Sequence, residues 1–254
     1  MRGGDIATVA LNNPGKLNAL TVAMWRELAR TMGELSADDG LRCIVLRGAG
    51  DAAFAAGADI AEFAHARNDF AHGKVYHLEY VAGALTAVGE CRHPTVALIQ
   101  GPCAGGGLEI ACACDLRISS VSGRFGVPIN RLGFSIAYGE LAGLLELAGR
   151  AVAAEILLEG RMWDADEAFA KGLLTRVVPD DKVEAEAYAA ARRIADGAPL
   201  VARWHKQFIR RLTPQAAPLT AAELDANFDY FKTDDYRIGY DAFISKKKPK
   251  FTGK

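Results

Sequence analysis

The chain has 254 residues, half of them hydrophobic and 24% charged, so it is long enough to enclose a large core. A formal net charge of −1 gives no global attraction to nucleic acid or to an anionic membrane, and the longest apolar runs are too short to span a bilayer. We therefore expect neither as a partner. Five cysteines, an odd number without framework spacing, favour reduced thiols and a cytoplasmic location.

Strands and helices alternate through the first half of the chain. Thr21 is a good helix cap, and apolar residues follow it at helical spacing as far as Leu35. A helical stretch from 59 to 90 has a predicted break near Gly73. This order predicts a mainly parallel, doubly wound α/β sheet with right-handed crossovers. Strands are expected at 6–11, 41–46, 95–99 and 116–119.

Beyond Gly139 the pattern is mostly helical, with one further strand expected at 173–178. Pro199, Pro214 and Pro218 separate the last helices. We expect residues 1–195 to form the α/β core, and residues 196–254 to form a C-terminal helical region that covers the core or a neighbouring subunit. The expected helices are 141–147, 151–158, 164–171, 181–194, 200–212 and 221–231.

The segment from His93 to Asp115 carries the clearest chemical signal, with the sequence HPTVALIQGPCAGGGLEIACACD. A short apolar strand leads into a loop with three consecutive glycines, and a helix of small apolar residues follows. Glycines at a helix start let a ligand approach bare backbone N–H groups. Glu109 is the one carboxylate in that helix, and burying it is costly unless it is protonated or paired. Together these features predict a site that stabilises an oxyanion and moves a proton.

Each of these features also has a purely structural interpretation. Gly105 to Gly107 would make a tight strand–helix turn, and Asp59 would cap a helix after a loop. Lys16 alone would be an ordinary surface lysine. The cysteines after Glu109 and the histidines between 65 and 77 are poorly spaced for ligation, so we expect no metal site.

Several short motifs, in this order, resemble those of the enoyl-CoA hydratase/isomerase superfamily, also called the crotonase family. The resemblance extends over nearly the whole chain. The motifs are LNNPGKLNAL at 11–20, FAAGADI at 54–60, PTVALIQGPCAGGGLE at 94–109, FGVP at 125–128, LG at 132–133 and FISKKKPKFTGK at 243–254.

The resemblance implies a crotonase-like ββα spiral core, built from repeating turns of two strands and one helix. It also implies a C-terminal helical region that assembles homotrimers, often paired into homohexamers. An acyl-CoA thioester is the implied substrate and partner, with coenzyme A as part of that substrate and no separate cofactor.

By the same resemblance, the backbone N–H groups of Ala58 and Gly106 bind the thioester oxygen and stabilise an enolate, while Glu109 transfers protons. The helix that starts at the glycines directs its positive end at the same oxygen. The implied substrate-binding positions are Lys16 near the CoA phosphates, Ala56, Ala58, Asp59 and Ile60 around adenine and pantetheine, and Gly105, Gly106, Pro128 and Ile129.

One position departs from the hydratase pattern of this family. Two glutamates share the work on one water in those enzymes, and the second directly follows the motif FGxP. Here the motif reads FGVPIN, so Ile129 occupies that place. Losing a general acid–base group typically costs roughly 10²–10⁴-fold in rate. The second group must therefore come from elsewhere, or the chemistry must differ.

Three hypotheses follow. The first is an enoyl-CoA hydratase or isomerase that works through Glu109; the family's isomerases, however, usually keep the glutamate that is lost here. The second is another chemistry on the same enolate, such as hydrolysis, decarboxylation or a lyase reaction, which recruits Tyr138 or Glu140. Glu140 could equally be an N-terminal helix charge. The third is a catalytically weak acyl-CoA-binding subunit.

Overall fold

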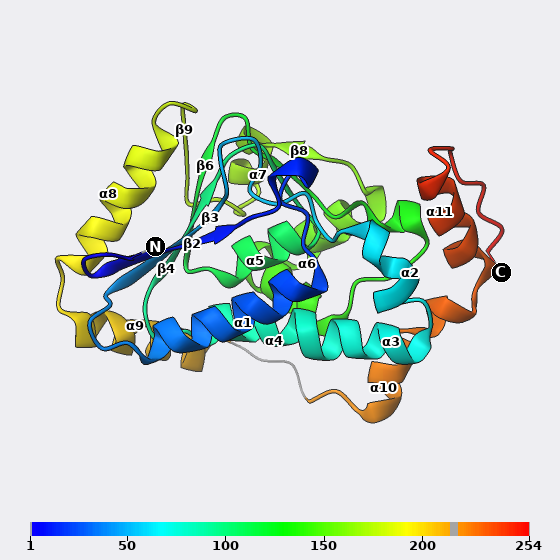
Figure 1. Cartoon of the computed structure of the whole chain (residues 1–254), viewed down its shortest axis with the longest axis horizontal. Helices are drawn as coiled ribbons and strands as arrows, with labels where there is room; N and C mark the ends of the chain where they lie inside the picture. The colour runs from blue at the N-terminus through cyan, green and yellow to red at the C-terminus, as the bar shows by residue number, and fades with distance from the viewer. Residues whose placement is uncertain (1, 214–217, 254) are drawn as a thin grey trace.

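The computed structural model describes residues 2–213 and 218–253, and its strands form two sheets (Figure 1). The main sheet has the order β1-β2-β3-β4-β6-β9, and its neighbours are parallel except β1 with β2. The smaller sheet has the order β5-β7-β8. The strands are β1 (Arg2–Gly3), β2 (Ile6–Leu11), β3 (Cys43–Gly48), β4 (Thr95–Ile99), β5 (Pro102–Ala104), β6 (Leu116–Ser120), β7 (Arg124–Gly126), β8 (Trp163–Asp164) and β9 (Arg176–Val178).

Successive strands of the main sheet are added at one edge in chain order, so the winding never reverses. The mainly parallel sheet predicted from the sequence is confirmed, but the doubly wound arrangement is wrong. The ββα spiral implied by the resemblance describes the chain correctly. One turn runs through β4, β5 and α5 (Gly106–Ala113), and the next through β6, β7 and α6 (Tyr138–Glu159). Parallel pairing of β5 with β7 stacks these turns.

Alternate residues of the buried strands face opposite sides of the main sheet. Cys43 and Val45 of β3 pack with α8 (Val183–Ala195), whereas Ile44 and Leu46 belong to the larger core on the other side. This is the period-two pattern of a strand buried on both faces. In Figure 1, α8 lies on one side of the sheet, and α1 (Val22–Ala37), α4 (Ala82–Glu90) and α5 lie on the other.

The helical stretch between β3 and β4 breaks at a different place from the predicted one. The first helix of this stretch ends before Arg67, and the next begins after Asp69. The side chain of Asp69 caps that second helix by accepting the N–H of His72. Gly73 lies inside α3 and does not break it. The position needs glycine because a Cβ there would come within 2.2 Å of the ring of Phe231. Its smallness serves close packing. The pieces are the 3₁₀ turn η2 (Ile60–Glu62), α2 (Phe63–Ala66), α3 (Phe70–Val75) and the π-helical turn η3 (Tyr76–Val81).

The C-terminal half is helical, as predicted, with different boundaries. The helices expected at 141–147 and 151–158 are joined in α6 across a kink at Gly149, whose φ is +75°. The helix expected at 221–231 ends at Ala226, and α11 was not separately predicted. The predicted break at Pro214 lies outside the described residues. Further elements are η1 (Pro14–Lys16), η4 (Pro128–Leu132), α7 (Ala165–Ala170), α9 (Pro199–Leu212), α10 (Ala221–Ala226), η5 (Asp229–Lys232) and α11 (Asp234–Ile244).

Within residues 2–213 and 218–253, no helix has the length and apolar character that crossing a membrane requires. The predicted boundary between residues 195 and 196 falls between α8 and α9 and stays a prediction.

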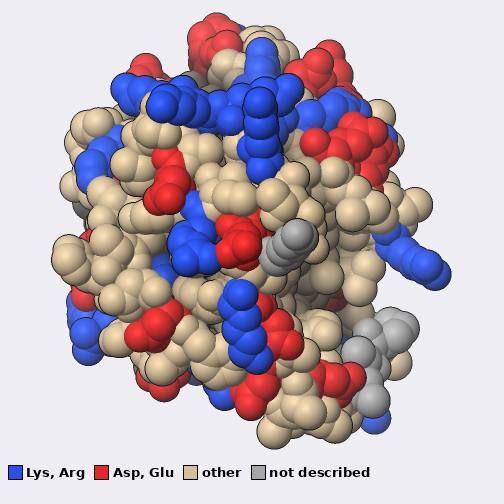
Figure 2. Space-filling view, turned by 90° about the vertical axis from the view of Figure 1, so that its right-hand side faces the viewer, with Lys and Arg blue, Asp and Glu red and all other residues tan. Residues whose placement is uncertain are grey.

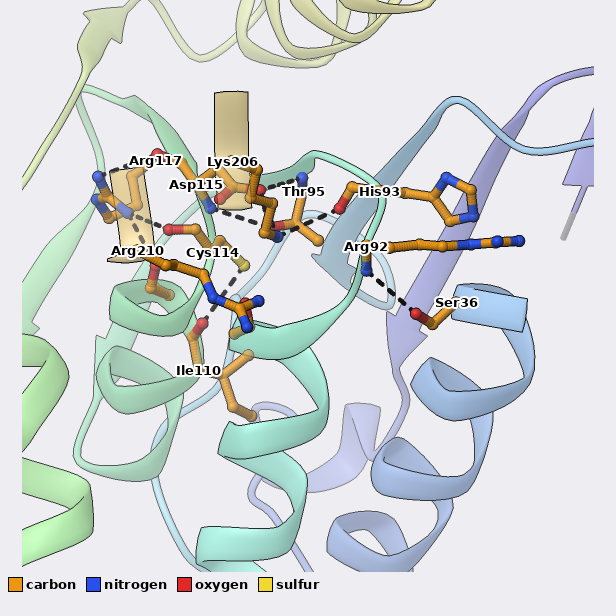
Figure 3. A network of polar contacts seen from close by, with 12 residues as sticks. Ser36, Arg92, His93, Thr95, Ile110, Cys114, Asp115, Arg117, Lys206 and Arg210 are labelled. Carbon is orange, nitrogen blue, oxygen red and sulfur yellow. Dashed lines mark hydrogen bonds and ion pairs between the residues drawn. The ribbon is translucent and has the colours of Figure 1, made fainter. Parts of the chain in front are cut away.

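An ion pair between a buried lysine and a partly exposed aspartate ties α9 to the main sheet (Figure 3). The side chain of Lys206 is only 6% exposed, and its Nζ lies 2.7 Å from Oδ2 of Asp115 and 3.2 Å from the carbonyl oxygen of His93. The same carboxylate oxygen accepts the backbone N–H and the hydroxyl of Thr95 at 2.7 and 2.9 Å. Asp115 therefore joins the end of α5, the start of β4 and the middle of α9.

Replacing Asp115 with Asn is expected to lower the free energy of unfolding by roughly 1.5–3 kcal/mol, because the buried ammonium of Lys206 loses its counter-charge. Denaturant unfolding followed by circular dichroism measures this change. The double variant D115N/K206M removes both charges and should be more stable than D115N alone. Equal stability of wild type and D115N would show that this pair does not hold α9 in place.

Candidate active site

A cavity of about 650 Å³ lies where the loop before η2, the start of α5, the turn η4 and the first turn of α6 meet. Segments far apart in the sequence converge here. All of the positions that the motifs assigned to the site border this cavity, and their individual roles stay predictions. They are Lys16, Ala56, Ala58, Asp59, Ile60, Gly105, Gly106, Glu109, Pro128 and Ile129.

Two backbone amides border the cavity with their hydrogen-bonding capacity unused. Gly106 is the first residue of α5, so the helix offers its N–H no acceptor. Ala58 pairs with Leu20 in an isolated bridge, but the neighbours of Ala58 make the hydrogen bonds. The N–H of Leu20 donates to the carbonyl of Gly57, and the N–H of Asp59 donates to the carbonyl of Leu20. Neither amide donates to any group within the part of the chain that the structure describes. Both are therefore available to an acceptor in the cavity.

Close packing accounts for the three glycines at the start of α5. Gly105 has φ +47° and ψ −123°, a conformation that favours glycine. A Cβ on Gly106 would lie 2.7 Å from the ring of Trp25, and one on Gly107 would lie 2.4 Å from the carbonyl oxygen of Ala55. The start of α5 can lie against this loop only because these positions carry no side chain.

Glu109 lies in the cavity wall, in the first turn of α5. Burial raises the pKa of its carboxyl well above the ordinary value, the neighbouring Glu140 raises it further, and the Arg67 cation acts in the opposite direction. Glu109 therefore holds a proton much more firmly than a glutamate in water does.

Arg67 is the buried cation of the site, and the sequence motifs did not point to it. The guanidinium carbon lies 4.3 Å from the ring centre of Phe63 and 4.1 Å from that of Phe134. One of its nitrogens, Nη2, donates to the hydroxyl of Tyr230 at 2.9 Å. Aromatic faces suit a planar guanidinium. Because Arg67 lies in an irregular segment between α2 and α3, no periodicity marked it.

His77 and Glu140 form a second buried polar pair on the cavity wall, in which Nδ1 of His77 is hydrogen-bonded to Oε1 of Glu140. Burial lowers the pKa of His77, so its ring is neutral and Nδ1–H donates. Burial also acts to raise the pKa of Glu140, but His77, the N–H of Ala137 and the Arg67 cation outweigh it, and the net direction is downward. The pair is a neutral imidazole beside a carboxylate.

The structure separates the two substitutes that the sequence offered for the missing glutamate. Tyr138 is 43% exposed and does not border the cavity. Glu140 borders the cavity and also accepts the N–H of Ala137 at 3.2 Å, so its place at the start of α6 serves both the helix and the site. Ile129 presents an apolar side chain to the same cavity.

Charged groups lie toward the outside of the site. Nζ of Lys16 is 2.7 Å from Oδ2 of Asp59, and the lysine side chain is half exposed. Phe243 near the end of α11 borders the cavity, and the exposed residues Lys246, Lys247, Lys248 and Lys250 follow that helix. Figure 2 looks at the α11 side of the molecule, where Lys and Arg gather across the upper part of the view. Positive charge there favours a phosphate-bearing ligand.

No cluster of three or more His, Cys, Asp or Glu side chains suited to a metal ion occurs in the described ranges 2–213 and 218–253.

Known proteins resemble this chain in both sequence and fold. "Probable enoyl-CoA hydratase" of Rhizobium meliloti (strain 1021) is 36% identical over 254 residues, covering 98% of this chain and 95% of its own. A short-chain-enoyl-CoA hydratase of Clostridium acetobutylicum is 32% identical, covering 96% and 93%.

Two solved structures extend the comparison. An enoyl-CoA hydratase/carnithine racemase of Magnetospirillum magneticum is 52% identical, with a TM-score of 0.82 and coverage of 100% of this chain and 94% of its own. A methylmalonyl-CoA decarboxylase in complex with 2-nitronate-propionyl-CoA is 25% identical, with a TM-score of 0.88 and coverage of 100% and 97%. Residues 2–254 match the enoyl-CoA hydratase/isomerase family, and the chain belongs to that family, the crotonase superfamily.

Proposed function

We propose that this protein adds water to the double bond of a 2-enoyl-CoA thioester through an enolate intermediate. The observation that carries the proposal is the meeting of two unused amides, those of Ala58 and Gly106, with the half-buried acid Glu109 in one cavity. The hydratase names of the relatives agree with this reaction.

In this proposal the thioester oxygen accepts both N–H groups, and negative charge moves onto that oxygen when the enolate forms. Amides fixed before the reaction stabilise this charge without reorganising, and each is worth roughly 3–4 kcal/mol in comparable sites. The start of α5 adds its positive end. Lys16 and the loop from Ala56 to Ile60 hold the CoA portion. The chemistry uses no cofactor apart from the coenzyme A of the substrate.

Glu109 supplies the proton that the α-carbon receives. A carboxyl with a raised pKa is suited to act as a general acid, and delivery of its proton to the α-carbon converts the enolate into the saturated thioester. Isomerisation of a 3-enoyl-CoA would instead start from the ionised form of the same carboxyl, which would take a proton from one carbon and return it to another.

Decarboxylation of a malonyl-type thioester is a second candidate. Arg67 borders the cavity, and its Nε has no hydrogen-bond partner among the described residues, so the guanidinium could hold a substrate carboxylate. Loss of carbon dioxide would leave its electron pair in the same enolate. The likeness to the methylmalonyl-CoA decarboxylase structure supports testing this reaction.

Replacing Glu109 with Gln is expected to slow hydration of crotonyl-CoA by roughly 10²–10⁴-fold, because an amide cannot deliver the proton. Loss of the enoyl-thioester absorbance measures the rate, and isothermal titration should find thioester binding retained. Glu146→Gln alters an exposed glutamate of α6 and serves as the matched control. Full activity in Glu109→Gln would remove Glu109 from the mechanism.

We also propose that copies of the chain associate through α9, as trimers or as pairs of trimers. This helix keeps large apolar side chains on its outside, including Phe208, Ile209 and Leu212 at 56%, 66% and 81% exposure. Apolar area of this kind is characteristic of an interface. All five cysteines are buried and unpaired, which agrees with the cytoplasmic location we propose.

Introducing Glu at both Phe208 and Ile209 is expected to convert the assembly into monomers, because two charges would be buried at the interface. Analytical ultracentrifugation at micromolar concentration measures the mass. Gln207→Glu places a charge on an exposed position of the same helix and should leave the assembly intact. A monomeric wild type would contradict the proposal.

A further inference from the structure

We propose that Glu140, positioned by His77, is the second carboxyl group of the active site and takes the proton from the attacking water. The proposal rests on the hydration reaction above and adds to it the residue that position 129 does not provide. It is carried by four features of the cavity: the contact between two helices, the hydrogen bonding of Glu140, the distribution of charge, and the apolar side chain of Ile129.

The contact between α5 and α6 places Glu140 close to Glu109. A Cβ on Gly143 would lie 3.4 Å from the Cβ of Cys112, so the two helices touch one turn beyond each carboxyl. Both carboxyls border the same cavity, and Glu140 is close enough to raise the pKa of Glu109. Glu140 therefore borders the cavity from α6, whereas the residue at position 129 borders it from η4.

Hydrogen bonds fix the carboxylate of Glu140 without exhausting it. Oε1 accepts Nδ1–H of His77, and Oε2 accepts the N–H of Ala137 at 3.2 Å. Each carboxylate oxygen has a second lone-pair direction, so both retain the capacity to accept a proton from water. His77 is held in the π-helical turn η3, an irregularity that often occurs at functional sites. It acts on the reaction only through Glu140.

The polar and charged groups around the cavity shift the pKa values of the two carboxyls in opposite directions, which makes one an acid and the other a base. Glu140 is faced by the imidazole of His77 from η3, the cation of Arg67 from the segment after α2, and Glu109 from α5. The hydroxyl of Tyr76 faces the same groups: burial raises its pKa, Arg67 acts to lower it, and Glu140 and Glu109 act to raise it. The result is a raised pKa at Glu109 and a lowered pKa at Glu140. Two carboxyls whose pKa values are moved apart are the usual acid and base of a site.

The proposed step balances. Glu140 removes one proton from water, and the oxygen forms a bond to the β-carbon. The electron pair of the double bond moves through the α-carbon onto the thioester oxygen, where the two amides stabilise it. Glu109 then delivers its proton to the α-carbon. Water has been added, Glu140 is protonated and Glu109 is ionised. Transfer of the proton from Glu140 to Glu109 restores the starting state.

The apolar side of the cavity indicates that water attacks from the side of Glu140. Ile129 and Pro128 border the cavity from η4 and offer no side-chain acceptor to a water molecule. Glu140 offers two. A water molecule that needs a partner is therefore held on the α6 side of the substrate.

Glu140→Gln tests the proposal directly. It keeps the shape of the side chain and removes the base, so kcat for crotonyl-CoA hydration should fall roughly 10²–10⁴-fold with little change in KM. Thioester binding measured by isothermal titration, which needs the amides and the CoA-binding loop but no base, should persist. Tyr138→Phe, an exposed residue of the same turn outside the cavity, is the control and should match wild type in both assays.

Variants of His77 test its effect on Glu140 through the pH profile of kcat, which would not shift if His77 only supported the fold. His77 lowers the pKa of Glu140, so His77→Leu should shift the acidic limb of the kcat profile toward higher pH, where Glu140 becomes protonated sooner. His77→Asn places an amide donor near the former Nδ1 and should move the limb back toward its wild-type position. This pair decides the question if Glu140→Gln does not fold.

The outcomes separate the two proposals. An active wild type together with a fully active Glu140→Gln, or with unshifted pH profiles in both His77 variants, overturns the assignment of Glu140 and leaves the proposed function standing. A wild type that hydrates no 2-enoyl-CoA overturns the proposed function, and the role of Glu140 falls with it because there is no water to activate.

Discussion

The close approach of the first turn of α5 to the loop at Ala55 is the constraint on which the site depends. Gly107 has no room for a Cβ, which would lie 2.4 Å from the carbonyl oxygen of Ala55. This contact places the free N–H of Gly106 beside the loop that carries Ala58, and it aims the positive end of the helix into the cavity. A side chain at either glycine would separate the two amides, so the backbone itself forms the polar end of the site.

Electrostatic balance is the second requirement, because Arg67, His77 and Glu140 are buried around one cavity and Glu109 is half-buried in its wall. The cation of Arg67 compensates the carboxylate of Glu140, while the raised pKa of Glu109 and the lowered pKa of His77 each favour the uncharged form of that group. A buried set with no net charge avoids the large cost of an uncompensated ion. The aromatic rings of Phe63 and Phe134 hold the cation without supplying a further negative charge.

The C-terminal elements complete the site from outside the spiral. Tyr230 of η5 accepts a hydrogen bond from Arg67, and Phe243 of α11 borders the cavity. On the other side of the molecule, Lys206 fastens α9 to the start of β4 (Figure 3). The spiral thus provides the amides and the acid, while the elements after it contribute part of the wall and hold the cation in place.

The sequence by itself determined the elements with strong local signals. The glycine turn before α5, the buried strands and the cap at Thr21 all depend on neighbouring residues, and so do the motifs that gather at the cavity. Its strand and helix pattern could not determine the one-directional winding of the sheet, which only the family resemblance implied, because alternation of strands and helices is the same for either winding. Nor could it reveal that Arg67, His77 and Glu140 meet. These residues lie in three segments without shared periodicity, and only the packing of α6 against α5 turns a residue at a helix start into a neighbour of Glu109.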